Sequence, residues 1–256
     1  MDWSPSQYLK FEDDRTRPAR DLMNAVPNRR VRKAIDLGCG PGNSTELIVE
    51  RYPDAEVSGI DSSADMVAKA RERVPGIDFE VADIGTWSGE GAYDLIFANA
   101  VLQWLPDHEQ LLPRLVHRLG EGASLAIQMP DNLDEPSHRS MRDAARQGPW
   151  ASRLAAADAI RTEIGPPQFY YDLLQPLCRR VEIWRTVYHH PLDGVEGVVQ
   201  WFKGTGLMPY LALLDEEERQ AYLDRYRDLL RERYDISRDG RLLLAFPRLF
   251  IVATRR

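Results

Sequence analysis

The stretch Asp36-Leu-Gly-Cys-Gly-Pro-Gly-Asn-Ser-Thr45 places three glycines at alternate positions behind an aspartate. A short apolar run, residues 31–35, precedes it, and residues 46–52 follow it with the pattern of a helix. Glycine accepts backbone conformations that side chains forbid and lets a ligand approach the main chain closely. The glycines therefore predict a strand-to-helix turn that lies against a ligand.

Strand-like and helical patterns alternate on both sides of this turn. Helical patterns cover residues 64–74 and 108–119, and the strand-like runs are 34–37, 56–60, 78–82, 94–98 and 124–129. The first helix follows a capping signature, Ser62-Ser63-Ala64-Asp65, and its apolar residues Met66, Val67, Ala70 and Val74 fall on one side, which is expected to pack on the sheet. This alternation predicts an α/β fold with a doubly wound, mostly parallel sheet covered by helices on both faces. Further on, helical cap segments are expected at 135–178 and 194–235, with strands at 181–189 and at the end of the chain. In the second cap segment Tyr222, Tyr226, Leu229 and Leu230 recur at helical spacing, which favours a cap that packs on itself over a ligand contact.

Composition limits the class of protein. With 256 residues, of which 43% are hydrophobic, the chain suits a single globular domain, 1–256. A net charge of −7 and a pI near 5.4 argue against a nucleic-acid or anionic-membrane surface. No apolar segment approaches the roughly 20 residues that span a bilayer, so a cytoplasmic location is expected. The two cysteines, Cys39 and Cys178, have no metal or disulfide spacing.

The glycine spacing narrows the ligand to two classes of nucleotide. Dinucleotide-binding turns follow G-x-G-x-x-G and hold a pyrophosphate, whereas Gly38, Gly40 and Gly42 alternate here behind Asp36. A carboxylate at this strand end repels a pyrophosphate and attracts an ammonium or sulfonium group. S-adenosylmethionine carries both cations and no phosphate, so this motif favours it.

Two further acids follow the next two strands. Asp61 ends the second strand, where a carboxylate suits the hydroxyl pair of a ribose, although NAD would use the same acid. Asp83-Ile84 follows the third strand, where the acid suits the adenine amino group and the apolar side chain suits its ring. Each acid alone has a structural explanation, as a helix cap or a turn residue. Acids at three successive strand ends favour S-adenosylmethionine.

With these motifs the sequence resembles the class I S-adenosylmethionine-dependent methyltransferases. The resemblance rests on Asp36-Leu-Gly-Cys-Gly-Pro-Gly42, Gly59-Ile-Asp-Ser-Ser63, Ala82-Asp-Ile84 and Asp94-Leu-Ile-Phe-Ala-Asn99, and similarity to carboxyl-methylating members continues through flanking stretches nearly end to end, except from about 146 to 167. It implies a seven-stranded sheet whose last strand is antiparallel. It also implies an N-terminal segment, 1–30, that covers the cofactor, and a cofactor-binding core at 31–130.

The resemblance implies transfer of a methyl group to one carboxylate oxygen of trans-aconitate, with S-adenosyl-L-homocysteine as the other product. A carboxylate has a pKa of about 4, so it is already an ionised nucleophile at neutral pH and needs no general base. The catalytic residues would then be positioning groups, foremost Trp104 and Arg15. The expected partner is a small-molecule carboxylic acid, with neither nucleic acid nor membrane, and the oligomeric state stays undetermined.

The implied site divides into cofactor and substrate residues, with no metal ligands. The cofactor residues are Tyr8, Phe11, Asp36, Gly38, Gly40, Gly42, Asp61, Ser62, Met66, Asp83, Ile84, Asn99 and Trp104. The substrate residues are Arg15, Arg17, Tyr171, Arg185 and Trp201, with Tyr170, His189 and Arg248 as weaker candidates. Arginine is favoured because its planar fork matches a carboxylate, although exposed arginines are usually solvated and buried aromatic residues usually serve packing.

Three other functions stay open from the sequence. The chain could methylate a different small acceptor, it could bind S-adenosylmethionine without catalysis, or, more distantly, it could be an NAD oxidoreductase. An acceptor site without a facing arginine would favour the first of these, and a blocked acceptor pocket would favour the second.

Overall fold

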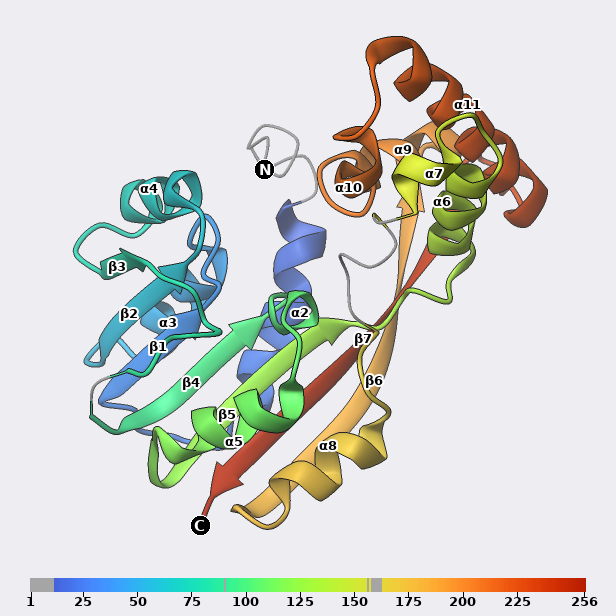
Figure 1. Cartoon of the computed structure of the whole chain (residues 1–256). Coiled ribbons are helices and arrows are strands. Elements are labelled where there is room, and N and C mark those ends of the chain that lie inside the picture. The colour runs from blue at the N-terminus through green and yellow to red at the C-terminus, as the bar shows by residue number, and fades with distance from the viewer. Residues whose placement is uncertain (1–11, 90, 156, 158–162) are drawn as a thin grey trace. The chain divides into compact units, whose positions relative to one another are not determined.

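The computed structural model describes residues 12–89, 91–155, 157 and 163–256 (Figure 1). These residues form two compact units. The sheet unit comprises Arg15–Pro130, Ile164–Thr186 and Leu249–Arg256, and the helical unit comprises the described parts of 1–14 and 131–163 together with Val187–Arg248. The helical segment expected at 135–178 therefore divides between the units, because its last part belongs with the sheet.

A seven-stranded sheet forms the framework. Its strands are β1 (Lys33–Leu37), β2 (Glu56–Asp61), β3 (Asp78–Val81), β4 (Tyr93–Asn99), β5 (Leu119–Pro130), β6 (Cys178–Leu192) and β7 (Leu242–Arg255), in the order β3-β2-β1-β4-β5-β7-β6. The first five strands pair in parallel, and β7 runs in the opposite direction (Figure 1). The predicted fold class is confirmed, including the antiparallel final strand.

The strand order reverses between β1 and β4. From β1 the chain winds outward through β2 to β3, then returns to β4 on the other side of β1 and continues to β5. In open α/β sheets, ligands bind beyond the carboxyl ends of the strands at such a reversal. The segments that follow β1, β2, β3 and β4 therefore form the expected binding edge.

The helices of the sheet unit cover both faces of the sheet. They are α2 (Glu12–Ala25), α3 (Asn43–Arg51), α4 (Ala64–Arg73), α5 (His108–His117) and α8 (Pro167–Leu174), with a 3-10 turn, η1 (Leu102–Trp104), after β4. Figure 1 shows α5 in front of β4 and β5, and α2 behind them. The predicted apolar stripe of α4 is confirmed, since Met66, Val67, Ala70 and Val74 are all buried.

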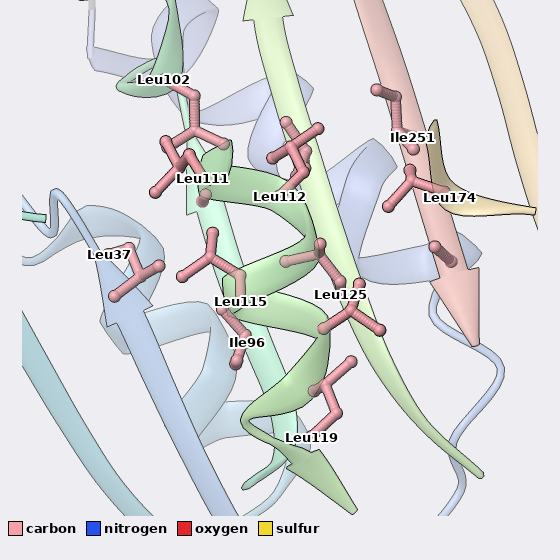
Figure 2. Close-up of a cluster of buried hydrophobic side chains, with 14 of the residues drawn as sticks. Leu37, Ile96, Leu102, Leu111, Leu112, Leu115, Leu119, Leu125, Leu174 and Ile251 are labelled. Atoms are coloured by element: carbon pink, nitrogen blue, oxygen red, sulfur yellow. The ribbon is translucent and has the colours of Figure 1, made fainter. Parts of the chain in front are cut away.

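The main core of the sheet unit lies between α5 and the sheet. Figure 2 shows Leu111, Leu112 and Leu115 of α5 gathered with Ile96 of β4 and Leu125 of β5. Leucines at helical spacing i, i+1 and i+4 place one continuous apolar stripe on the sheet. This packing fixes the position of α5 on the sheet.

The helical unit has its own core. Its helices are α6 (Pro136–Arg146), α7 (Ala151–Leu154), α9 (Gly194–Lys203), α10 (Met208–Leu211) and α11 (Glu216–Arg233). The stripe of α11 predicted from the sequence, Tyr222, Tyr226, Leu229 and Leu230, is buried in this core. These side chains pack within the helical unit, as expected of a helical cap that packs on itself.

No helix in the described part of the chain is both long and apolar enough to cross a membrane.

Candidate functional site

The glycine loop after β1 has the backbone geometry that glycine alone accepts easily. Gly38, Gly40 and Gly42 have φ values of +69°, +53° and +93°. The backbone N–H groups of Gly38 and Cys39 donate to the carbonyl oxygen of Ile60, at 2.8 and 2.9 Å. The loop is therefore attached to the end of β2, and its conformation depends on glycine.

Gly38 and Gly40 of this loop differ in the atoms that surround them. A Cβ atom at Gly38 would lie 2.3 Å from Cγ2 of Val101, which follows β4, whereas a Cβ at Gly40 would meet no atom within 4 Å. Gly38 thus lets the loops after β1 and β4 approach each other, and Gly40 leaves its surroundings open.

Asp61 links the glycine loop to the start of α4. Its Oδ2 accepts a hydrogen bond from the backbone N–H of Gly40 at 3.0 Å, and its Oδ1 accepts one from the N–H of Ser63 at 2.9 Å. Ser63 in turn caps α4 through the N–H of Met66 at 3.4 Å, which confirms the predicted helix start. Ser62, which lies between Asp61 and Ser63 in the sequence, is exposed. Each carboxylate oxygen of Asp61 still has capacity for a second hydrogen bond.

Asp36 is fully buried beneath the loop. The hydroxyl groups of Ser44 and Thr45, in the first turn of α3, each donate to its Oδ2 at 2.7 Å. Its Oδ1 is buried and has no hydrogen-bond partner among the described residues. Burial raises the pKa of Asp36 to about 7, the two hydroxyl bonds lower it in part, and repulsion from Asp61 raises it further.

Asp83 and Ile84 form a turn after β3. The Oδ1 of Asp83 accepts the backbone N–H of Gly85 at 2.7 Å, and its carbonyl accepts the N–H groups of Thr86 and Trp87 at 3.1 and 2.8 Å. The Asp83 side chain is exposed, whereas Ile84 is buried in the main core. Asp83 can both stabilise this turn and accept a ligand group, the two roles considered from the sequence, because the turn engages only one oxygen of its carboxylate.

Asn99 is the last residue of β4, and Trp104 lies in the segment that follows it. The Oδ1 of Asn99 is buried and lacks a hydrogen-bond partner in the described part of the chain. Ala100 has a φ of +56°, and Gln103 supports this turn by donating from its side chain to the Ala100 carbonyl at 2.7 Å. Trp104 is half-buried in η1. These residues stand at the same sheet edge as the three acids.

His108 belongs to a closed hydrogen-bond network that the sequence did not indicate. Its Nε2 lies 2.9 Å from the carbonyl oxygen of Leu102, and its Nδ1 lies 2.9 Å from the hydroxyl of Tyr170. A carbonyl only accepts, so Nε2 carries the proton and Nδ1 accepts from Tyr170. Tyr170 also accepts from the backbone N–H of Gly165 at 3.1 Å. Both ring nitrogens of His108 are thus engaged in structure.

Arg114 is a second residue that the sequence did not indicate. Its Nη2 donates to the carbonyl oxygen of Ile84 at 2.9 Å, which joins α5 to the turn after β3. No motif marks this arginine, because the contact depends on how α5 packs against the sheet.

The predicted substrate residues lie on separate elements. Arg17 is exposed on α2, Tyr171 is 44% exposed on α8 and Arg185 is exposed on β6, all in the sheet unit. Trp201 belongs to the helical unit, where it is 2% exposed and its ring lies 4.4 Å from that of His190. Tyr8, Phe11 and the side chain of Arg15 lie outside the described residues.

Cys39 is a packing residue of the glycine loop. It is 2% exposed in a small cluster with Val67 and Phe79. Burial raises the pKa of its thiol well above the ordinary value, so the reactive thiolate does not form near neutral pH. Among the residues that the structure describes, no three His, Cys, Asp or Glu side chains gather as a metal site would require.

The order of the strands and the acidic residues at the carboxyl edge of the sheet place this chain in the class of methyltransferase folds. A family model described as "Methyltransferase domain" matches residues 34–122. Among solved structures, the YcgJ protein from Bacillus subtilis has a TM-score of 0.61 and 12% identity, covering 94% of this chain and 99% of that one. Phosphoethanolamine N-methyltransferase 2 from Haemonchus contortus has a TM-score of 0.56 and 14% identity, covering 94% and 53%. At these identities the likeness concerns the fold.

Curated relatives give the particular family. A trans-aconitate 2-methyltransferase from Rhizobium etli is 53% identical and covers 100% of both chains. The proteins of that name from Methylobacterium nodulans and Variovorax paradoxus are 54% and 49% identical, and they cover 99% and 100% of this chain and 98% and 99% of their own. The chain therefore belongs to the trans-aconitate 2-methyltransferase family, within the S-adenosylmethionine-dependent methyltransferases.

Alanine at the two loop glycines should separate backbone strain from steric conflict. Both Gly38→Ala and Gly40→Ala should lose about 1–2 kcal/mol of unfolding free energy, because a left-handed backbone is unfavourable for alanine. Gly38→Ala should lose about 1–3 kcal/mol more, because its Cβ overlaps Val101. Urea denaturation of the two variants measures this difference. Equal losses would contradict the tight approach of the two loops.

Asp36 should make stability depend on pH in the ligand-free protein. The raised pKa means that its contribution is complete below the unfolded value of 3.8 and is lost as pH rises through about 7. Since a tenfold change in proton affinity corresponds to about 1.4 kcal/mol, the full loss is about 4 kcal/mol. Asp36→Asn, which cannot ionise, should gain stability relative to wild type between pH 4.5 and 8 in urea denaturation. A difference that stays constant across this range would show that Asp36 is ionised throughout.

Proposed function

We propose that this chain transfers the methyl group of S-adenosylmethionine to a carboxylate oxygen of trans-aconitate, giving its monomethyl ester and S-adenosylhomocysteine. The observation that carries this proposal is the name shared by curated relatives that are 49–54% identical over essentially their full length. At this identity over both whole chains, conservation of the acceptor is the simplest inference.

The carboxyl edge of the sheet fits the cofactor at several points. The open space at Gly40 and the positive φ values of its loop suit a ligand lying on the backbone. The Oδ1 atoms of Asp36 and Asn99 are buried hydrogen-bond acceptors that meet no donor among the residues the structure describes. An ammonium group is such a donor, and its positive charge would favour the ionised form of Asp36. The residues present therefore fit an aminoacyl nucleoside that carries no phosphate.

Each acid has a distinct role in this assignment. Asp61, whose two oxygens retain one acceptor site each, would accept the two ribose hydroxyl groups. Asp83 would accept the adenine amino group with the oxygen that its own turn does not use, and Ile84 would contact the adenine ring. The amino-acid part would lie over Gly38, Gly40 and Gly42, with its carboxylate near the N-terminus of α3, where unpaired N–H groups favour anions. Ser62, Met66, Asn99 and Trp104 complete the proposed lining, with Tyr8 and Phe11 as its cover.

The cofactor supplies an electrophilic methyl group, and the protein supplies position and exclusion of water. An ionised carboxylate attacks this methyl group without first losing a proton. His108, at the start of α5, is unsuited as a general base, because both of its ring nitrogens are engaged in hydrogen bonds. Cys39 is held as a thiol. These features favour an acceptor that needs no base.

The acceptor residues follow from charge. A tricarboxylate approaches a protein of net charge −7, so local guanidinium groups are needed to bind it. Arg15, Arg17 and Arg185 are the proposed clamps, since a planar fork binds a carboxylate in two places. Tyr171 and Trp201 are proposed as further substrate contacts. Trp104 is proposed to position the sulfonium group, because an aromatic ring attracts a positive charge.

A transfer assay with labelled S-adenosylmethionine tests the proposal. Over a panel of di- and tricarboxylates, trans-aconitate should be the best acceptor, and its trimethyl ester should be inert. At saturating cofactor, single-turnover transfer to trans-aconitate should stay nearly constant from about pH 6 to 9, because its carboxyl groups titrate well below this range.

Two results would contradict the proposal. One is transfer to an alcohol or amine in preference to every carboxylate. The other is a steep rise in rate with a midpoint near neutral pH, removed by a substitution such as His108→Gln, because that behaviour requires a general base.

A further inference from the structure

Arg114 lies on α5, six residues after His108, and belongs to none of the segments proposed to touch the cofactor. Its guanidinium is half-buried and donates to the carbonyl oxygen of Ile84, 30 residues earlier, at 2.9 Å. A hydrogen bond from a charged donor is roughly twice as strong as one between neutral groups. The bond therefore anchors the turn after β3 to α5, which is itself fixed by its leucine stripe on the sheet.

The anchored turn is held from two directions. From within, the N–H of Gly85 occupies Oδ1 of Asp83, and the carbonyl of Asp83 accepts the N–H groups of Thr86 and Trp87. From outside, Arg114 holds the next carbonyl along the chain. The internal bonds fix the shape of the turn, and the burial of Ile84 in the main core holds one side of it, while the Asp83 side chain is exposed. Arg114 supplies the charged contact from a neighbouring helix.

We infer that Arg114 is a positioning residue for adenine recognition. By holding the Ile84 carbonyl, it keeps Oδ2 of Asp83 where the adenine amino group donates to it, and it keeps Ile84 against the ring. The inference rests on the proposed function, because it takes Asp83 as the acceptor of the adenine amino group. The inference gives α5, a helix with no proposed contact to the cofactor, a part in selecting the base.

The chain offers a matched control in Arg71. This arginine lies on α4 and donates from Nη2 to the carbonyl oxygen of Phe79. The bond has the same donor and acceptor groups, but Phe79 lies within β3, four residues before Asp83 and outside the turn that Arg114 contacts. Loss of the Arg71 bond removes a structural contact of β3 without releasing the adenine turn.

Calorimetry with two ligands tests the inference. S-adenosylhomocysteine carries the adenine amino group, and S-inosylhomocysteine carries an oxygen in its place, which the Asp83 carboxylate repels. The wild-type protein should bind the first at least about tenfold more tightly, as expected of one charge-assisted hydrogen bond. In Arg114→Met this preference should fall below about threefold, with most of the loss in affinity for S-adenosylhomocysteine.

Two further variants complete the design. Arg114→Lys keeps a cationic donor and should restore a preference between those of wild type and Arg114→Met. Arg71→Met should keep the wild-type preference. If Arg114→Met does not fold, Arg114→Lys carries the test, and an intermediate preference supports the inference.

Several outcomes would overturn it. Equal loss of affinity for both ligands in the Arg114 variants would mean that Arg114 only stabilises the fold. The same loss of preference in Arg71→Met would mean that any weakening of β3 has this effect. A wild-type protein that binds both ligands equally would refute the Asp83 assignment together with the inference, and one that binds neither would refute the proposed cofactor site itself.

Discussion

The carboxylate of Asp61 holds together the two strand ends on which the site depends. It accepts the N–H of Gly40 from the loop after β1 and the N–H of Ser63 at the start of α4. The Ile60 carbonyl adds two bonds to the same loop. The glycine loop is thus shaped by the end of β2, and the acid that shapes it also faces the proposed ribose. In the proposed site, one side chain therefore couples the fold of the loop to ligand binding.

Charge is the basis of the proposed preference of this sheet edge for a cationic ligand. Asp36 is buried close enough to Asp61 for their repulsion to raise its pKa, and its Oδ1 has no partner in the described part of the chain. Such a group is costly in the ligand-free protein. A ligand with an ammonium and a sulfonium group relieves this cost, whereas a pyrophosphate increases it. In the proposed assignment, the electrostatics of the loop separate this site from a dinucleotide site that uses the same fold.

Much of this arrangement could be predicted from local sequence. The glycine loop, the Ser63 cap and the α4 stripe depend on residues within a few positions of one another, so their patterns indicated them directly. The hydrogen bonds from Tyr170 to His108 and from Arg114 to Ile84 join residues 62 and 30 positions apart, and no local pattern encodes them. The assignment of residues 164–178 to the sheet unit likewise depends on α8 packing, where Tyr170 and Leu174 are buried. The arginines proposed for the acceptor remain predictions for the same reason, since their roles depend on tertiary placement.

The affinity of Asp61→Asn for S-adenosylhomocysteine tests the central claim most directly, because the substitution keeps the shape of the side chain, removes its charge and replaces one accepting oxygen by a donating NH2 group. Calorimetry should give a loss of at least about tenfold relative to wild type, as expected when hydrogen bonds to a charged acceptor are weakened. Circular dichroism should show that the variant is folded. Unchanged affinity in a folded Asp61→Asn protein would contradict the assignment of this edge of the sheet as the cofactor site.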